Sequence, residues 1–303
     1  MVQRYHCGDC LKYFRAKRRN QTVFQKELWK LYVFGKQTIR ELALTFNKDK
    51  RTIRKELALY QSPDKKHQPR SVHLVVDGTY FGERTEATSW CVVVARDAKT
   101  KENLWWTFCS AETTTIYRSM RTELEQQGYT ILSVTGDGFG GIKHAFSGIP
   151  YQMCQVHMKR LIIKGTTRRP KLEAGVVLLA LVRHLKDTDS QTFNRYLRHY
   201  IEKYHSFLNE RSLNYLTGEE QWTHEPLRSA LRSLIAFEPF LFTYEQIPNT
   251  PKTTNSLEGH FRHINEVVAI HCGLTREHKE RVIQTILLAG TIAPSEEVLR
   301  EIL

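Results

Sequence analysis

Four apolar segments between residues 71 and 137 limit the fold of this chain more strongly than any other feature. The segments "SVHLVVDGTYFG", "SWCVVVARD", "NLWWTFCS" and "YTILSVTGD" are rich in β-branched and aromatic residues, which favour strands. A helical pattern at about residues 112–127 separates the third segment from the fourth. Three strands joined by short turns, then a helix and a fourth strand, predict an α/β or α+β fold in which helices pack on a mixed sheet.

Basic charge is concentrated in the first 70 residues. They hold 18 of the 45 Lys and Arg residues but only 6 of the 32 Asp and Glu residues. This segment therefore carries a net charge of +12, and residues 71–303 carry the remaining +1 of the total of +13. Such a concentration is typical of a region that binds nucleic acid, because each phosphate that it neutralises releases a counterion. A solvated basic tail is the alternative.

Three short amphipathic segments follow one another between residues 22 and 60 and predict three helices. Thr38 and Glu41 have the spacing of a capping box at the start of the second helix, and Asp49 is placed to cap the third. This pattern is typical of a helix-turn-helix, whose recognition helix lies in the major groove of DNA. The side chains expected on the outer face of that helix are Lys50, Arg51, Thr52, Arg54 and Lys55. A small helical bundle with a solvated face is the alternative.

Cys7 and Cys10 in "RYHCGDCLKYF" have the spacing of one half of a zinc ribbon. Structural zinc takes four protein ligands, and no second Cys-x-x-Cys follows at a suitable distance. We therefore expect either that the natural chain starts further upstream or that the knuckle is a remnant. The longest apolar stretches, such as residues 174–182, are too short to span a membrane, and no signal peptide is evident, which predicts a cytosolic protein.

Three acidic residues lie where a sheet or a helix could present them. Asp77 in "VVDGTYFG" and Asp137 in "TGDGFGGI" follow apolar strand segments, although Asp-Gly after such a run is also a common hairpin turn. Glu258 in "TNSLEGHFRHIN" lies near a helix start, where Asn255 and Glu258 also have the spacing of a capping box. If the three acids converge, their carboxylates can bind two hard cations such as Mg²⁺.

The order and spacing of these residues resemble the catalytic core of Mutator-type insertion-sequence transposases. The resemblance covers about residues 71–290 and rests on Asp77, Asp137, the Cys154-x-x-His157 pair in "CQVHMKR" and Glu258. It implies an RNase H-like fold with a DDE metal site, in which Asp77, Asp137 and Glu258 bind two Mg²⁺ or Mn²⁺ ions. It also implies that Cys154 and His157 lie near the active site. Taken without the resemblance, these two residues favour a packing and hydrogen-bonding pair, since two ligands make an incomplete zinc site.

The predicted domains follow from these assignments. They are a partial zinc-ribbon knuckle (residues 1–20), a helix-turn-helix DNA-binding region (21–62), an RNase H-like core in two parts (71–154 and 251–303), and an all-helical insertion between them (155–250). Residues 61–71 predict a linker, because they contain two prolines and no periodic pattern. Trp222 within the insertion favours a packing role, and stacking on unpaired or distorted DNA is the alternative.

The resemblance therefore predicts a DNA transposase that binds the terminal inverted repeats of a mobile element and its target DNA. It implies magnesium-dependent strand cleavage by water and strand transfer by a 3′-hydroxyl group, performed by a homo-oligomer in a synaptic complex. For a prokaryotic host, it further implies a cytoplasmic protein that associates with the nucleoid. Two alternatives stay open: an RNase H-like nuclease that cleaves without strand transfer, and a non-catalytic DNA-binding regulator derived from such an element.

Overall fold

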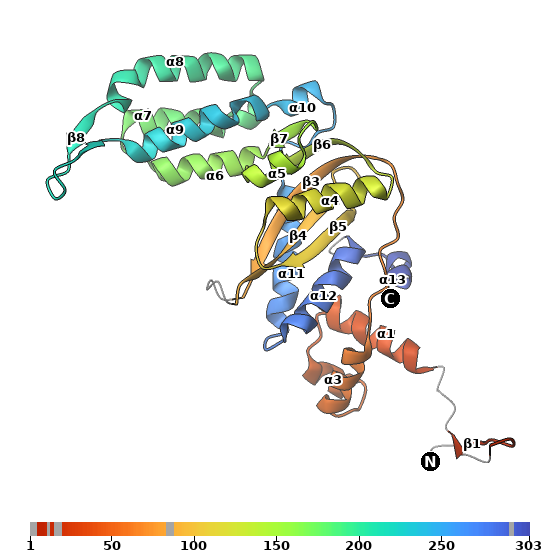
Figure 1. Ribbon diagram of the computed structural model, residues 1–303. Coiled ribbons are helices and arrows are strands. Elements are labelled where there is room, and N and C mark those ends of the chain that lie inside the picture. Colours follow the sequence, from red (N-terminus) through yellow and green to blue (C-terminus); the bar gives the residue numbers. More distant parts are fainter. Residues whose placement is uncertain (1–4, 11–12, 15–19, 83–87, 291–293) are drawn as a thin grey trace. The chain divides into compact units, whose positions relative to one another are not determined.

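The computed structural model describes residues 5–10, 13–14, 20–82, 88–290 and 294–303 (Figure 1). By their contacts the residues form two compact units, Met1–Lys66 with Arg262–Leu303 and His67–Phe261. The boundary between Lys66 and His67 falls inside the predicted linker. The predicted functional domains, whose bounds follow from the positions of the motifs, stay a prediction. None of the described helices combines the length and the apolarity that crossing a membrane requires.

A mixed five-stranded sheet forms the centre of the second unit and confirms the predicted α/β architecture. Its order is β5-β4-β3-β6-β7, from β3 (Ser71–Phe81), β4 (Trp90–Asp97), β5 (Asn103–Cys109), β6 (Thr130–Gly136) and β7 (Tyr151–Met153). The pairs β3–β4 and β4–β5 are antiparallel, whereas β3–β6 and β6–β7 are parallel. The first four strands match the four predicted segments, and β7 is an additional edge strand.

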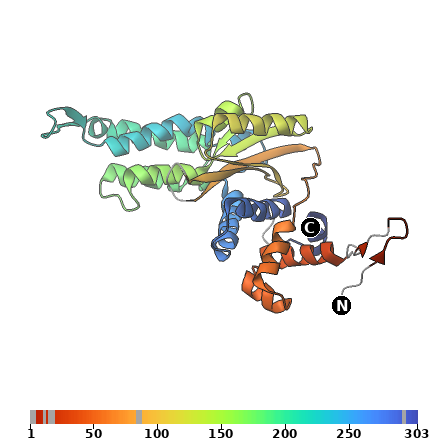
Figure 2. The ribbon, with the colours of Figure 1, turned by 60° about the horizontal axis from the view of Figure 1, so that its bottom comes forward.

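The two faces of β3 have different partners. Leu74 and Val76 pack into the core that α4 (Thr114–Gln126) covers with Tyr117 and Met120. Since successive side chains of a strand point to opposite faces, Asp77 points to the other face. Figure 2 shows α4, in yellow, on one side of the sheet and the start of α11 (Asn255–Ile270), in light blue, on the opposite side. Asp77 therefore shares a face with the first turns of α11.

Two polar contacts attach the start of α11 to the sheet. The Arg96 guanidinium donates to the carbonyl oxygen of Ser256 at 2.7 Å, and the Asn103 side-chain amide lies 3.2 Å from Nε2 of His260. Arg96, Asn103 and His260 are all buried. Because an unsatisfied buried polar group is costly, these contacts fix the position of α11 on the sheet.

The segment between β7 and α11 is mostly helical, as predicted, and the sheet lies at one end of it (Figure 1). Its α-helices are α6 (Gln155–Thr166), α7 (Glu173–Arg183), α8 (Ser190–Leu208), α9 (Glu225–Phe237) and α10 (Thr243–Gln246). The prediction of an all-helical insertion is wrong in one place, because β8 (Arg211–Leu213) and β9 (Glu220–Trp222) form an antiparallel hairpin. Its turn uses Gly218 at φ +71°, a conformation that favours glycine.

The first unit contains the three predicted helices, α1 (Asn20–Val33), α2 (Ile39–Thr45) and α3 (Lys50–Leu59). The predicted capping box of Thr38 and Glu41 and the cap by Asp49 are both present. The C-terminal helices α12 (Arg276–Ala289) and α13 (Glu296–Ile302) belong to the same unit. Trp29 of α1 is fully buried and donates to the Thr285 hydroxyl of α12 at 3.0 Å. The three-helix region therefore shares its core with the C-terminal end of the chain.

Gly138 follows β6 and Asp137, and we predict that its replacement by alanine destabilises the second unit more than Gly148→Ala does. Both glycines have positive φ, +100° and +84°, so each alanine incurs backbone strain of about 1–2 kcal/mol. Only at Gly138 would the new Cβ also lie 3.0 Å from the Met153 side chain, which adds about 1 kcal/mol or more. Urea denaturation of both variants measures the difference, and equal losses would contradict the close packing at Gly138.

Candidate metal centre

Asp77 lies inside β3 and not in a turn. The strand continues to Phe81 and pairs with β4 along this length, so the hairpin-turn alternative for Asp77 is wrong. The parallel pairing of β3 with β6 ends at Val75 and Thr135, two residues earlier. Because β6 no longer pairs with β3 at Asp77, other elements can approach Asp77 on this side of the strand. Only 9% of Asp77 is exposed, and its Oδ1 accepts a hydrogen bond from the amide of Gly78 at 2.9 Å.

Glu258 lies in the first turn of α11, which begins at Asn255. The carbonyl oxygen of Thr254 accepts the first helical hydrogen bonds, from the amides of Leu257 and Glu258. Both carboxylate oxygens of Glu258 accept hydrogen bonds from the Arg160 guanidinium, at 2.9 Å and 2.7 Å. The capping-box alternative required an oxygen of Glu258 on the amide of Asn255, and the carboxylate is directed instead to another helix.

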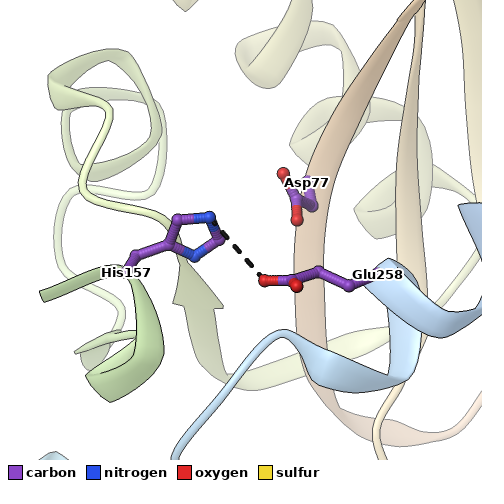
Figure 3. Close-up of side chains that lie close together, drawn as sticks. All are labelled: Asp77, His157 and Glu258. Carbon is purple, nitrogen blue, oxygen red and sulfur yellow. Dashed lines mark ion pairs between the residues drawn. The ribbon is translucent and has the colours of Figure 1, made fainter. Parts of the chain in front are cut away.

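Asp77, His157 and Glu258 form a group that could hold a metal ion, and each comes from a different element (Figure 3). One ligand atom from each residue lies within 4.8 Å of the others. Nε2 of His157, on α6, is 3.8 Å from Oε1 of Glu258. Within the described part of the chain this is the one group of three or more such side chains. It therefore marks the strongest candidate for a functional site.

Cys154 and Thr254 join the two helix starts beside this group. Cys154 is the N-cap residue of α6, and its thiol accepts contacts from the amide and the hydroxyl of Thr254 at 3.3 Å and 3.5 Å. The Thr254 hydroxyl also lies 3.4 Å from Nδ1 of His157. The structure thus gives Cys154 the packing and hydrogen-bonding role that its position in the sequence favoured. His157 differs, because its ring also faces the carboxylates.

Asp137 directly follows β6, the strand beside β3, as the sequence predicted, but it is not a member of the three-residue group. Its Oδ1 accepts a hydrogen bond from the amide of Phe139 at 2.9 Å, so the residue does act in a turn. Its charge is close enough to raise the pKa of both Asp77 and His157. The predicted triad of Asp77, Asp137 and Glu258 stays a prediction, and His157 is the residue that the structure places beside the other two.

Burial dominates the ionisation of this site. It raises the pKa of Asp77 to about 7, an effect that the charge of His157 opposes and that of Asp137 reinforces. Burial alone would lower the pKa of His157, but the hydrogen bond that it donates to the Cys154 sulfur and the nearby negative charges raise it above its usual value. The Cys154 thiol, although buried, has a lowered pKa because His157 and Thr254 donate to it. The site therefore attracts positive charge, which a divalent cation could supply.

Two side chains that sequence reasoning missed belong to this region. Arg160 lies one helical turn after His157 and forms the bidentate pair with Glu258, and its own side chain is 54% exposed. Glu112 accepts a hydrogen bond from the Tyr117 hydroxyl at 2.6 Å, and burial raises its pKa. A Cβ on Gly78 would lie 2.7 Å from the Glu112 carboxyl group. The spacing of Arg160 from His157 was a usable signal, whereas nothing local marks Glu112.

The predicted DNA-binding residues lie on α3, which buries Ile53 and Leu57. Lys50, Arg51, Arg54 and Lys55 are exposed. Thr52 differs, because its amide and its hydroxyl both donate to the Asp49 carboxylate, at 2.8 Å and 2.6 Å. Four of the five residues are therefore available to an external phosphate, and Thr52 serves as part of the helix cap.

The remaining predicted positions show no completed site. Cys7 and Cys10 lie between the short paired strands β1 (Tyr5–His6) and β2 (Tyr13–Phe14), and among the described residues no further ligand joins them. Trp222 has two guanidinium groups over its ring, that of Arg211 at 4.2 Å and that of Arg228 at 3.8 Å. These contacts give Trp222 the packing role that its sequence context favours.

Neither a protein-family model nor a curated protein matches this chain. The resemblance to Mutator-type transposases therefore rests on the ordered sequence motifs alone.

Replacing Asp77 by asparagine should stabilise the protein at pH 8. A carboxyl group whose pKa is raised in the folded state contributes stability at low pH, and this is lost as the pH rises from about 4 to about 7. Asparagine is neutral throughout, so the variant should gain about 2–4 kcal/mol at pH 8 and much less near pH 4. Chemical denaturation in the presence of EDTA measures this, with the exposed Asp64→Asn as control. If the variant is less stable than the parent at pH 8, the buried charge of Asp77 does not destabilise the folded state.

Removing the Arg160 guanidinium should strengthen the binding of Mn²⁺. A cation shared by Asp77 and Glu258 competes with Arg160 for the same oxygens, and a partly exposed ion pair contributes about 1 kcal/mol. Arg160→Ala should therefore bind Mn²⁺ about 5-fold more tightly in a calorimetric titration. Lys159→Ala makes the same change of charge at the neighbouring residue and should have a smaller effect. Equal Mn²⁺ affinities in the two variants would show that the pair does not compete with the metal.

Proposed function

We propose that this chain is a DNA transposase whose strand cleavage and strand transfer depend on divalent metal ions. The observation that carries the proposal is the meeting of Asp77, from the central strand of a mixed sheet, with Glu258, from a helix that returns to that sheet after a long helical detour. The strand order and the mixed pairing are compatible with the RNase H-like fold that the motifs imply.

The side chains present fit a divalent cation. Carboxylate oxygens suit Mg²⁺ and Mn²⁺, and the imidazole of His157 suits Mn²⁺ better than Mg²⁺. Asp77 and Glu258 would hold the ion with His157, and Asp137 would join them at a second ion through the oxygen that does not accept from Phe139. When bound, the two ions would activate the attacking oxygen and stabilise the leaving oxygen in a phosphoryl transfer. A bound ion also requires ionised carboxylates and a neutral imidazole, so loading should release protons.

The chain's own residues have separate tasks in this proposal. Asp77 and Asp137 would hold the ions in place relative to the sheet, and Glu258 would do so from α11. The exposed cations of α3 would bind the phosphates of the terminal repeats and fix the position of the first unit on that DNA. Two such chains would hold the two element ends in one synaptic complex. The basic composition of residues 1–70 supports this division of labour.

Each of Asp77→Asn, Asp137→Asn and Glu258→Gln should lower Mg²⁺-dependent cleavage of end DNA by about 100-fold or more, since each removes a charged oxygen of nearly unchanged volume. Binding to the same DNA in EDTA should remain within about 3-fold of the parent, because these residues do not neutralise phosphates. Full cleavage by Asp137→Asn would show that Asp137 is not part of the site, which would then consist of Asp77, His157 and Glu258.

A strand-transfer assay separates the proposed transposase from a nuclease. End DNA with a free 3′-hydroxyl group is offered with a supercoiled target, and joined products are counted. Cleavage without joined products would identify the RNase H-like nuclease, and DNA binding without either reaction would identify the regulator.

A further inference from the structure

A second basic segment begins at the candidate metal centre. Residues 155–172 contain six Lys and Arg residues and no Asp or Glu residue, although residues 71–303 as a whole are almost neutral. The six side chains, which we call the α6 basic track, are Lys159, Arg160, Lys164, Arg168, Arg169 and Lys171, and all of them are exposed. The nearly neutral total of residues 71–303 therefore includes one strongly positive segment.

The track runs from the metal centre into the helical insertion. His157, Arg160 and Lys164 follow one another at spacings of three and four residues, which places them on one face of α6. Over these residues the helix advances about 10 Å. After α6 ends at Thr166, the chain turns at Thr167, with φ +74°, and Arg168, Arg169 and Lys171 lie in the loop to α7. Figure 1 shows α6 leading from the region of β7 toward α7.

The opposite face of α6 is held against the insertion. Met158, Ile162 and Thr166 are buried, and a Cβ on Gly165 would lie 2.5 Å from the carbonyl oxygen of Pro226 in α9. This close approach fixes which face of the helix is turned outward. Lys159, Arg160 and Lys164 are consequently presented by a packed helix, and the other three cations by the short loop that joins it to α7.

Most of these cations are not neutralised within the protein. Arg160 pairs with Glu258, and among the residues that the structure describes no carboxylate forms an ion pair with the other five. Some exposed cations elsewhere in the second unit do have acidic partners, such as Lys203 with Glu173. Attraction of Lys164 to the C-terminal end of α6 accounts for one of the five at most. A row of uncompensated charges raises the free energy of the folded chain and favours a polyanionic partner.

We propose that the α6 basic track binds the phosphate backbone of the DNA that enters the candidate metal centre. The inference rests on the proposed function for the identity of the polyanion, and on charge and geometry for the surface. Arg160 contributes to both sites, so the track begins where the reacting phosphate would lie. The linear order of the cations fits a strand of regularly spaced phosphates. It assigns to the insertion a DNA-binding role separate from that of α3.

The salt dependence of DNA binding tests this inference on the full chain. The variant Arg168→Ala with Arg169→Ala removes two cations of the track, and Arg195→Ala with Arg198→Ala removes two exposed arginines from α8 as a matched control. Affinity for a duplex of about 30 base pairs is measured in EDTA by fluorescence anisotropy, over about 50–200 mM salt. The slope of log affinity against log salt should fall by about 2 in the track variant and stay unchanged in the control, and affinity near 100 mM should fall about 10-fold or more.

Each outcome decides the inference. An unchanged slope in the track variant, or an equal fall in the control, would overturn it. Loss of binding to anionic lipid vesicles with DNA binding unchanged would identify a membrane as the partner and would also overturn it. The variant Arg51→Ala with Arg54→Ala in α3 shows the size of an effect expected from the first unit. Because binding is measured in EDTA, failure of cleavage by the parent chain would reject the proposed function without affecting this result.

Discussion

The burial of the Asp77 carboxyl group on the central strand is the constraint on which the rest of the site depends. A charged carboxylate there loses most of its hydration, and the pKa near 7 reflects that cost. The fold compensates by bringing positive charge to the same place: His157 lies beside Asp77, and Arg160 neutralises the adjacent Glu258. Both cations come from the first two turns of α6, so the direction in which α6 leaves the sheet is tied to the carboxylates. Neutral residues at the same positions would remove the electrostatic reason for α6 and α11 to meet.

Backbone geometry makes that meeting available. β6 stops pairing with β3 before Asp77, and β7 pairs with β6 over only three residues before Cys154 starts α6. The amide of Cys154 donates to the carbonyl oxygen of Gly136, the last residue of β6, at 2.8 Å. The start of α6 is thereby attached to the end of the strand that precedes Asp137. The thiol of Cys154 also accepts a hydrogen bond from the amide of Thr254, just before α11. Cys154 therefore connects β6, α6 and α11.

The sequence predicted the parts that local patterns encode. The four strands, α4, the three helices of residues 22–60 and two helix caps follow from periodicity and from capping residues, and the structure has all of them. β7 has three residues, too few for a pattern, and the hairpin of β8 and β9 interrupts a segment whose neighbours are strongly helical. The interaction of Arg160 with Glu258 joins residues far apart in the chain, so no local signal could show it. The cap contact of Thr52 was missed for a different reason, since the hydroxyl of a helix residue can serve the cap as well as a ligand, and its predicted DNA contact stays a prediction.

Arg160 connects the two binding events that the proposals assign to this unit. Its guanidinium engages both oxygens of Glu258 and also belongs to the outward face of α6. A divalent cation at Glu258 competes for those oxygens and leaves the guanidinium without its partner, whereas a phosphate on the α6 basic track supplies a new one. Binding of the metal ion thus makes binding of the phosphate more favourable, and the reverse. The two effects must be equal in size. The upper limit of this coupling is the strength of the Arg160–Glu258 pair, about 1 kcal/mol for a partly exposed pair. A coupling of this size changes either affinity about 5-fold, so the site would load its metal preferentially when DNA lies along α6.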